Sequence, residues 1–508
     1  MKTISRRDFL KLATVAGGAL LTTGVGGKME FPRNQSETSP NVIVIVFDAL
    51  SARNMSLYGY PRETTPNLER FARHATVYHS HYAGGSFTSP GTASLLTGTY
   101  PWTHRAYNLF GMVDRDLTGH NLFNVMGPRY QRLAFSQNLL PNYFFEQFSR
   151  DLDVILNPAS FSVDDYLLSF GFKNDRQMSY RAQEFLATEH PEVLSHSLIF
   201  GPTINYLLER LSASQSRDEF PVEMPQVENG AFYYTLSGIM NGLAETMDAA
   251  SSPFFHYHHL MAPHAPYRPD HRFHGQFDND NFKLVDKPRS RVDAGYKQVR
   301  LDEDRNLYDA FIANLDLEFG ILTDRMKEKG IFDNSYVIVT SDHGEMFERG
   351  VEGHLSRDLY EPGIHIPLLV STPGQNSRKD VYSPTNSVDI LPTLAHLAHE
   401  VVPDWCEGKI LPGLGGVEEP ERSIFTVEAK SNSAFTPIKK ATLAMRKGNY
   451  KLTHYMGYGT EDFFELYDIH ADPEELIDLA PSQPAFFKPM KDELLDTLEV
   501  KNKMFLAK

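Results

Sequence analysis

The sequence contains a single cysteine, Cys406, which excludes an internal disulfide and leaves no cysteine near the N-terminus for acylation. Basic residues are in the minority, since 49 Lys and Arg stand against 65 Asp and Glu, a formal net charge of -16. Proteins that bind nucleic acid gather Lys and Arg into clusters, and no such cluster occurs here, so we expect no nucleic-acid partner. After the N-terminal segment no apolar run is long enough to span a bilayer, which predicts a soluble mature chain.

The N-terminal segment has the pattern of a twin-arginine export signal. An Arg-Arg-x-Phe-Leu-Lys sequence at residues 6–11 precedes an apolar, glycine-rich stretch that ends near Val25. We expect residues 1–28 to be the signal and the polar residues 29–40 to be a linker. An ordinary basic amphipathic start is the alternative. The expected location is outside the cytoplasm: in the periplasm, in the cell exterior, or anchored to a membrane by an uncleaved signal.

Continuous β-branched runs predict strands that are buried on both faces of a parallel sheet. Such runs occupy residues 42–47, 336–340 and 366–370. Helical patterns follow Thr65-Pro66 and cover residues 308–320. The alternation predicts an α/β fold with a large, mostly parallel mixed sheet flanked by helices, and places the ligand site at the carboxyl edge of the strands.

A chain of 508 residues is too long for one core, so a large domain and a smaller one are expected. The large domain is predicted at residues 41–414, with an irregular, aromatic-rich insertion at about 138–228. Beyond it, short β-like segments within 441–453 and an amphipathic helix at about 487–500 predict a small α+β domain at 415–508.

Polar residues at the predicted strand ends point to a catalytic metal site. Asp48 follows the first strand, and Asp342 and His343 follow a later one, so the three converge at one sheet edge and offer ligands for a divalent ion. The alternative is that they are ordinary turn and loop residues. Thr88 lies just before Pro90, which can open a helix whose free N–H groups stabilise a phosphate or sulfate. A metal beside the Thr88 hydroxyl would make it a competent nucleophile.

Several segments resemble, in order, the sulfatase family of the alkaline-phosphatase superfamily. Residues 93–101 resemble the segment that follows the sulfatase nucleophile motif, and residues 342–345 resemble the family's metal motif. Residues 263–267 resemble its substrate-side histidine motif, and residues 388–393 and 465–468 are also sulfatase-like. The resemblance spans about residues 41–490.

This resemblance implies roles for individual residues. It makes Asp48, Asp342 and His343 metal ligands, Thr88 the nucleophile and fourth ligand, His264 a substrate contact or leaving-group acid, His354 an anion contact or second acid, and Arg357 a counterpart of the family's anion-binding lysine. For His264, His354 and Arg357 a purely structural role is the alternative. Three further histidines, His256, His258 and His259, lie on an expected strand, where structural roles are favoured over ligation.

The chain departs from the sulfatase pattern around the reacting centre. Thr88 stands where the family has the Cys or Ser that becomes formylglycine, which threonine cannot form, and Thr92 replaces the motif arginine. Ala49 replaces the second of two adjacent aspartates, and residues 135–138 replace a Lys-x-His motif. In having a threonine nucleophile, the chain instead resembles the superfamily's enzymes that act on phosphoryl groups. One divalent ion, Mn, Zn, Ca or Mg, is expected.

The expected function is therefore metal-dependent hydrolysis or transfer of phosphate or sulfate esters through a Thr nucleophile, with phosphodiesterase or phosphoryl transferase favoured. The substrate class is a small-molecule, glycan or lipid ester. A sulfatase that works without formylglycine is one alternative. A non-catalytic binding protein on a sulfatase fold is the other. The sequence leaves the natural substrate and the oligomeric state open.

Overall fold

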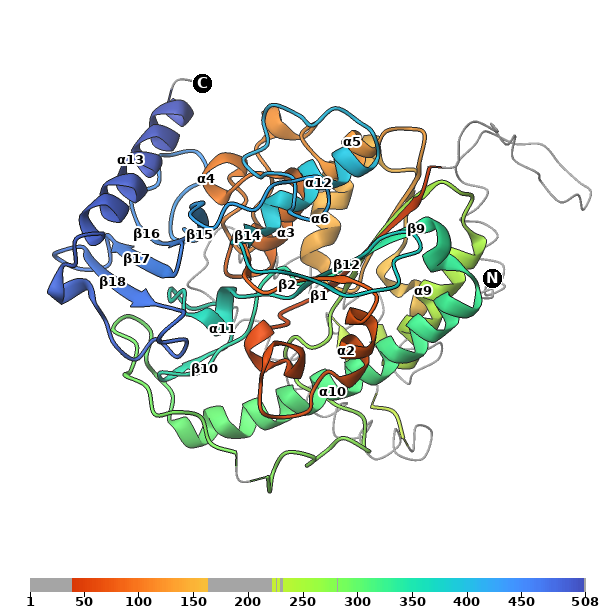
Figure 1. The fold of residues 1–508 in the computed structure, drawn as a ribbon, viewed down its shortest axis with the longest axis horizontal. Helices are drawn as coiled ribbons and strands as arrows, with labels where there is room; N and C mark the ends of the chain where they lie inside the picture. The colour runs from red at the N-terminus through yellow and green to blue at the C-terminus, as the bar shows by residue number, and fades with distance from the viewer. Residues whose placement is uncertain (1–38, 163–221, 225, 229–231, 281, 507–508) are drawn as a thin grey trace, which may run out of the picture.

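The computed structural model describes residues 39–162, 222–224, 226–228, 232–280 and 282–506. The predicted export signal, the linker up to residue 38 and most of the predicted insertion lie outside the described residues. In the described part, an eight-stranded sheet is flanked by helices, and a four-stranded sheet lies beside it (Figure 1). None of the helices described there has the length and apolar character needed to cross a membrane.

The large sheet has the strand order β13-β2-β12-β9-β1-β8-β4-β5. Its strands are β1 (Asn41–Phe47), β2 (Thr76–Tyr78), β4 (Gln131–Ser136), β5 (Val154–Ile155), β8 (Phe254–Leu260), β9 (Ser335–Thr340), β12 (Leu368–Ser371) and β13 (Lys379–Val381). β1 pairs in parallel with β8 and β9, and β4 pairs in parallel with β8 and β5. β12 is antiparallel to β9 and β2. The mostly parallel mixed sheet predicted from the sequence is confirmed.

The central strand β1 shows why its sequence has no polar alternation. All seven of its residues are buried. Ile43 and Ile45 pack into a hydrophobic core on one face of the sheet, whereas Val44 and Val46 pack into a second core on the other face. A strand covered by helices on both faces needs apolar side chains at every position.

Helices cover both faces of this sheet (Figure 1). One face carries α2 (Pro66–Ala72), α9 (Leu236–Ala249) and α10 (Gln298–Glu328), and the other carries α3 (Thr88–Thr97), α5 (Leu122–Met126), α6 (Leu139–Gln147) and α12 (Ile390–Leu397). α10 is longer than the predicted 308–320, because its first ten residues are mostly polar and only its centre shows apolar periodicity. β12 begins at Leu368 instead of residue 366, since Pro367 has no N–H to donate to a sheet ladder.

The C-terminal region forms a small antiparallel sheet with a helix, as predicted. Its elements are β15 (Ile424–Glu428), β16 (Ala441–Lys447), β17 (Tyr450–Met456), β18 (Phe463–Asp468) and α13 (Phe487–Leu506). Leu494 of α13 shares a hydrophobic core with Leu443 and Leu452 of the sheet. Tyr100 and Trp102, which follow α3, belong to the same core, so the small sheet packs directly against the larger domain.

Candidate active site

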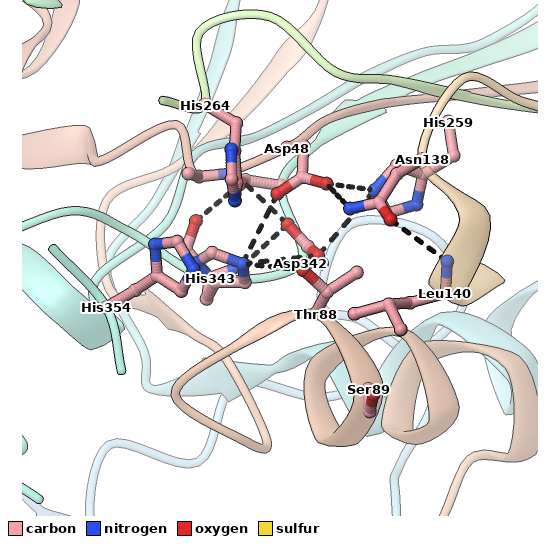
Figure 2. Close-up of polar contacts among 12 residues, drawn as sticks. Asp48, Thr88, Ser89, Asn138, Leu140, His259, His264, Asp342, His343 and His354 are labelled. Atoms are coloured by element: carbon pink, nitrogen blue, oxygen red, sulfur yellow. Dashed lines mark hydrogen bonds and ion pairs between the residues drawn. The ribbon is translucent and has the colours of Figure 1, made fainter. Parts of the chain in front are cut away.

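Four neighbouring strands of the large sheet end at one edge and bring polar residues together there. Asp48 follows β1, and Asp342 and His343 follow β9, the strand beside it. One ligand atom of each of these three residues lies within 4.8 Å of the other two. All three side chains are fully buried, and Figure 2 shows them facing one another. The structure thus unites the three residues that the sequence analysis selected as metal ligands.

Burial and charge oppose each other in this cluster. Burial would raise the pKa of Asp48, but the nearby His264 and the close contacts with the His259 and His343 rings hold it well below its usual value. Burial and the charge of Asp48 raise the pKa of Asp342. Burial would lower the pKa of His343, but the Asp342 and Asp48 carboxylates outweigh it and raise this pKa to about 9. Two buried carboxylates so close together call for a compensating positive charge.

The donor set fits a divalent metal ion. Asp48 Oδ1 and Asp342 Oδ2 are buried and accept no hydrogen bond, although buried carboxylate oxygens in proteins normally do. Carboxylate oxygen and imidazole nitrogen are ligands that zinc and manganese accept. Asp48, Asp342 and His343 would therefore hold the ion, and their oxygens without hydrogen bonds are free to coordinate it.

Thr88 reaches the cluster from the first turn of α3. Its Oγ1 lies 3.3 Å from His343 Nε2, and its side chain is buried. Gly91 permits this approach, because a Cβ at that position would lie 2.2 Å from the Asp342 carbonyl oxygen. The missing side chain thus lets the start of α3 pack against the end of β9. The Thr88 hydroxyl and the N-terminus of α3 therefore lie beside the Asp48, Asp342 and His343 cluster.

Two residues not chosen from the sequence hold Asp48 in position. Asn138 Nδ2 donates to Asp48 Oδ2 at 2.6 Å, and His259 Nε2 lies 3.2 Å from the same oxygen (Figure 2). His259 is also 3.6 Å from Asp342 Oδ2. Because Oδ2 is held by these two groups, Oδ1 is the Asp48 oxygen left for a cation. Asn138 lies in the segment 135–138 that replaces the family's Lys-x-His motif. That replacement is the feature of the sequence that could have indicated a site residue here.

Of the three strand histidines, His259 differs from His256 and His258 in its surroundings. Side chains alternate along a strand, so His256 and His258 of β8 point to the face opposite His259. Both are buried with ring nitrogens that make no hydrogen bond, which agrees with a packing role. His259 instead contacts two carboxylates of the cluster, an environment that periodicity cannot indicate without knowing which strands flank β8.

Asn138 offers a direct test of this arrangement. We expect Asn138→Ser to weaken metal binding about ten- to a hundredfold, since losing a partner that orients a ligand typically has this effect. Serine keeps a side-chain acceptor for the Leu140 N–H at the start of α6 but removes the amide donor to Asp48. Competition with a chelating dye measures the affinity. Asn124→Ser, which alters a surface bond to Asp151, is the control and should bind metal normally.

Three histidine rings line one side of the cluster. The His354 ring centroid lies 4.7 Å from that of His264 and 4.4 Å from that of His343. His354 Nδ1 is 2.9 Å from Glu345 Oε1, and His264 Nδ1 donates to the Ala265 carbonyl at 2.5 Å. In both rings Nδ1 is engaged, so Nε2 is the nitrogen left for a substrate. Burial lowers the pKa of His354 despite the Glu345 carboxylate, which favours a neutral ring.

The structure does not bring Arg357 into this cluster. Its guanidinium binds the Asp293 carboxylate and the Val292 carbonyl and lies over the Tyr458 ring. Within the part of the chain that is described, no hydrogen bond or ion pair joins it to the cluster. Arg357 lies near the site residues in the sequence, and this spacing suggested an anion-binding role. In the structure its guanidinium binds Asp293, which precedes α10, instead of facing the cluster.

Comparison with known proteins places this site in a family. Residues 40–400, which contain every residue of the cluster, match the family model described as Sulfatase. The chain belongs to the sulfatase family. Residues 353–503 match a second model, described as N-sulphoglucosamine sulphohydrolase, C-terminal. Membership confirms the resemblance that the sequence motifs indicated, and makes the protein an ester hydrolase.

Relatives in the sulfatase family are distant but match most of the chain. Choline-sulfatase of Rhizobium meliloti is 23% identical over 465 residues, which cover 87% of this chain and 82% of the relative. N-acetylgalactosamine-6-O-sulfatase of Bacteroides thetaiotaomicron is 22% identical over 558 residues, which cover 99% of this chain and 100% of the relative. The phosphonate monoester hydrolase of Agrobacterium radiobacter shares the fold, with a TM-score of 0.63 and 18% identity over 91% of this chain and 96% of that one.

The raised pKa of His343 predicts how this sulfatase-family site binds metal as the pH changes. A raised pKa means that the metal-free protein holds a proton on His343 below about pH 9, and this proton stabilises the fold until the pH rises through that value. A metal-bound imidazole must be neutral, so ion binding at pH 7.5 should release at least one proton, and affinity should rise toward pH 9. Calorimetry in two buffers of different ionisation enthalpy measures the release. Identical heats in both buffers would contradict it.

Proposed function

We propose that the chain hydrolyses phosphate esters, phosphodiesters in particular, in two steps with Thr88 as the nucleophile and one divalent ion at Asp48, Asp342 and His343. The observation that carries this proposal is the position of Thr88 Oγ1, which begins α3 and lies 3.3 Å from His343 Nε2 in the buried cluster. The phosphonate monoester hydrolase among the structural relatives supports attack on phosphorus. Sulfate esters, on which the named sulfatases act, are the second substrate class that the same chemistry admits.

In the first step Thr88 Oγ1 loses its proton to solvent and bonds to phosphorus, while the bond from phosphorus to the alcohol oxygen breaks. The departing oxygen takes a proton from His264 Nε2, the free nitrogen of that ring. A divalent ion, when bound, supplies positive charge that lowers the pKa of an adjacent hydroxyl and offsets charge on the ester. Free N–H groups in the first turn of α3 stabilise the phosphate oxygens.

In the second step water attacks the phosphothreonine, and its proton returns to His264 Nε2. The bond from phosphorus to Thr88 Oγ1 breaks, the phosphate monoester leaves, and Thr88 Oγ1 takes a proton from solvent. Asn138 and His259 keep Asp48 oriented throughout, and Glu345 fixes the tautomer of His354 beside the reacting group. An alcohol in place of water would give transfer, with the same atoms exchanged.

Threonine changes how the covalent ester must be resolved. Formylglycine, once hydrated, has a second hydroxyl on the reacting carbon and can expel its ester group by breaking the C–O bond. The Thr88 ester has no such hydroxyl, so it must be resolved by attack at phosphorus or sulfur. Thr92 and Ala49, which replace a basic and an acidic residue of the usual sulfatase pattern, also alter the anion-binding surroundings.

A substrate panel tests the proposed preference. Metal-loaded protein should cleave bis(4-nitrophenyl) phosphate with a kcat/KM at least about a hundredfold above that for 4-nitrophenyl sulfate, the order of discrimination that mismatched pocket contacts impose. Release of 4-nitrophenol gives both rates. Faster turnover of the sulfate ester would reject the phosphodiester preference. The natural ester, on a small molecule, glycan or lipid, is then sought among compounds of the preferred class.

We also propose that the protein is exported by the twin-arginine route and works outside the cytoplasm. The Arg-Arg pair at residues 6 and 7 with the apolar stretch behind it supports this. Replacing both arginines by lysine should retain the protein in the cytoplasm, as cell fractionation would measure. Unchanged export of that variant would argue for another route.

A further inference from the structure

A second cavity lies next to the active site, between the segment that follows β1 and the loop before α10. It measures about 240 Å³, a size that suits a small ligand group. Glu345, which binds His354 on the active-site side, forms part of its wall. In Figure 1 the segment after β1 lies alongside α10 and near β10 (Phe347–Glu348), whose two residues also line the cavity.

Acidic and basic side chains line this cavity together. Its acids are Glu345, Glu348 and Glu474, and its bases are Arg53, Lys283, Lys287 and Arg305. Every acid has a partner: Glu345 is 2.9 Å from His354, Lys287 lies 2.7 Å from Glu348 and 2.6 Å from Glu474, and Arg53 lies 2.5 Å from Glu474. None of these pairs involves Lys283 or Arg305.

Arg305 is the exceptional member of this lining. Its side chain is only 3% exposed, and its one ion pair among the described residues joins Nη2 to Asp302, whose side chain is 45% exposed. Nε and Nη1 are buried and make no hydrogen bond. Leaving donors of a buried charged group without acceptors is costly, so such groups are usually satisfied by a ligand or water. The Phe282 ring, 5.6 Å from the guanidinium carbon, shields the charge and strengthens it toward an anion.

We propose that this cavity is a second oxyanion-binding site, with Arg305 as its principal contact. The ligand is a carboxylate, sulfate or phosphate group, whose oxygens accept from Nε and Nη1. Lys283 adds positive charge at the exposed rim. The site does not depend on Thr88 chemistry, so it stands or falls separately from the proposed reaction.

Sulfate binding to the full-length, metal-loaded protein tests this proposal. Equilibrium dialysis with radiolabelled sulfate should show that Arg305→Met binds one sulfate fewer per chain than the unaltered protein, or binds it about ten- to a hundredfold more weakly, as expected for a lost charged hydrogen bond. Arg300→Met is the matched control, because Arg300 lies on the same helix with a side chain 60% exposed and should leave binding unchanged. Arg305→Lys keeps the positive charge but lacks the planar guanidinium, so it should bind sulfate with intermediate affinity.

Equal sulfate binding by Arg305→Met and the unaltered protein would overturn the site. So would an equal loss in Arg300→Met, since that would show a general charge effect. If Arg305→Met does not fold, Arg305→Lys decides alone, and unchanged affinity in it would reject the guanidinium contact. Mutation of Thr88 should leave the number of bound sulfates unaltered, which separates this result from the proposed reaction.

The same variants identify the source of the anion. If it belongs to the substrate, Arg305→Met should raise KM about tenfold or more for an ester that bears an additional carboxylate or sulfate, and leave KM unchanged for the matched ester without it. If it is a free anion, both KM values should stay unchanged while sulfate binding is lost. Each result supports the site and assigns its ligand.

Discussion

Replacing Thr88 with alanine is expected to lower turnover of every ester substrate at least about a thousandfold while Asp48, Asp342 and His343 still bind the metal. The reason is that Thr88 Oγ1 lies 3.3 Å from His343 Nε2, while no hydrogen bond among the described residues ties Asp48 or Asp342 to it. Steady-state rates of 4-nitrophenol release and metal content by atomic emission measure the two effects. Thr88→Ser should retain much of the activity because it keeps an oxygen at the same place.

Ser89 provides the matched control for this experiment. It is the next residue of α3, but its hydroxyl donates to the Leu109 carbonyl, away from the cluster (Figure 2). Ser89→Ala should therefore turn over substrate normally. Mass spectrometry of quenched reactions should find the phosphoryl group on the peptide containing Thr88. An alanine variant with a tenth or more of the original rate would remove Thr88 from the mechanism.

Loss of the metal is expected to have an effect of similar size. A chelator should abolish turnover, and added manganese or zinc should restore it, because an ion bound at Asp48, Asp342 and His343 would supply positive charge beside the nucleophile. Asp342→Asn should weaken metal binding at least about a hundredfold, since a charged ligand becomes neutral. Calorimetric titration of the chelated protein gives the affinity.

Asp316→Asn is the control for the aspartate variant. Asp316 is also buried, but it accepts hydrogen bonds from Asn67 and Leu68 at the start of α2 and lies outside the cluster. The Asp316→Asn variant should bind metal as tightly as the unaltered protein, even if α2 is less stable. Full activity in thoroughly chelated protein, with its metal content verified, would refute the role of the ion.

The sequence predicts the parts of this protein that depend on local pattern. Strands β1 and β9 are unbroken apolar runs, and parallel strands end at one edge, so Asp48, Asp342 and His343 were correctly expected to meet. Periodicity does not reveal which strand lies beside which. The contact of His259 with Asp48 follows from β8 pairing with β1, and that of Asn138 from β4 pairing with β8, and neither order is written in the residues themselves.

Arg357 shows the opposite limitation. Its place in the chain near His354 suggested a role at the site, but the direction of a long side chain depends on tertiary partners, here Asp293. The cavity at Arg305 was likewise beyond reach from sequence, since its lining comes from six separate segments of the chain.

The way the site is assembled has a consequence for biogenesis. Ala49, beside one ligand, bonds to Asp342 across 293 residues of chain, and the intervening strands must all be in register before the ligands meet. A ribosome-bound fragment that ends before β9 has no ion-binding centre at all. Metal loading therefore requires the chain to be made and folded at least through His343, and uptake of the ion during refolding would report the joining of β9 to β1.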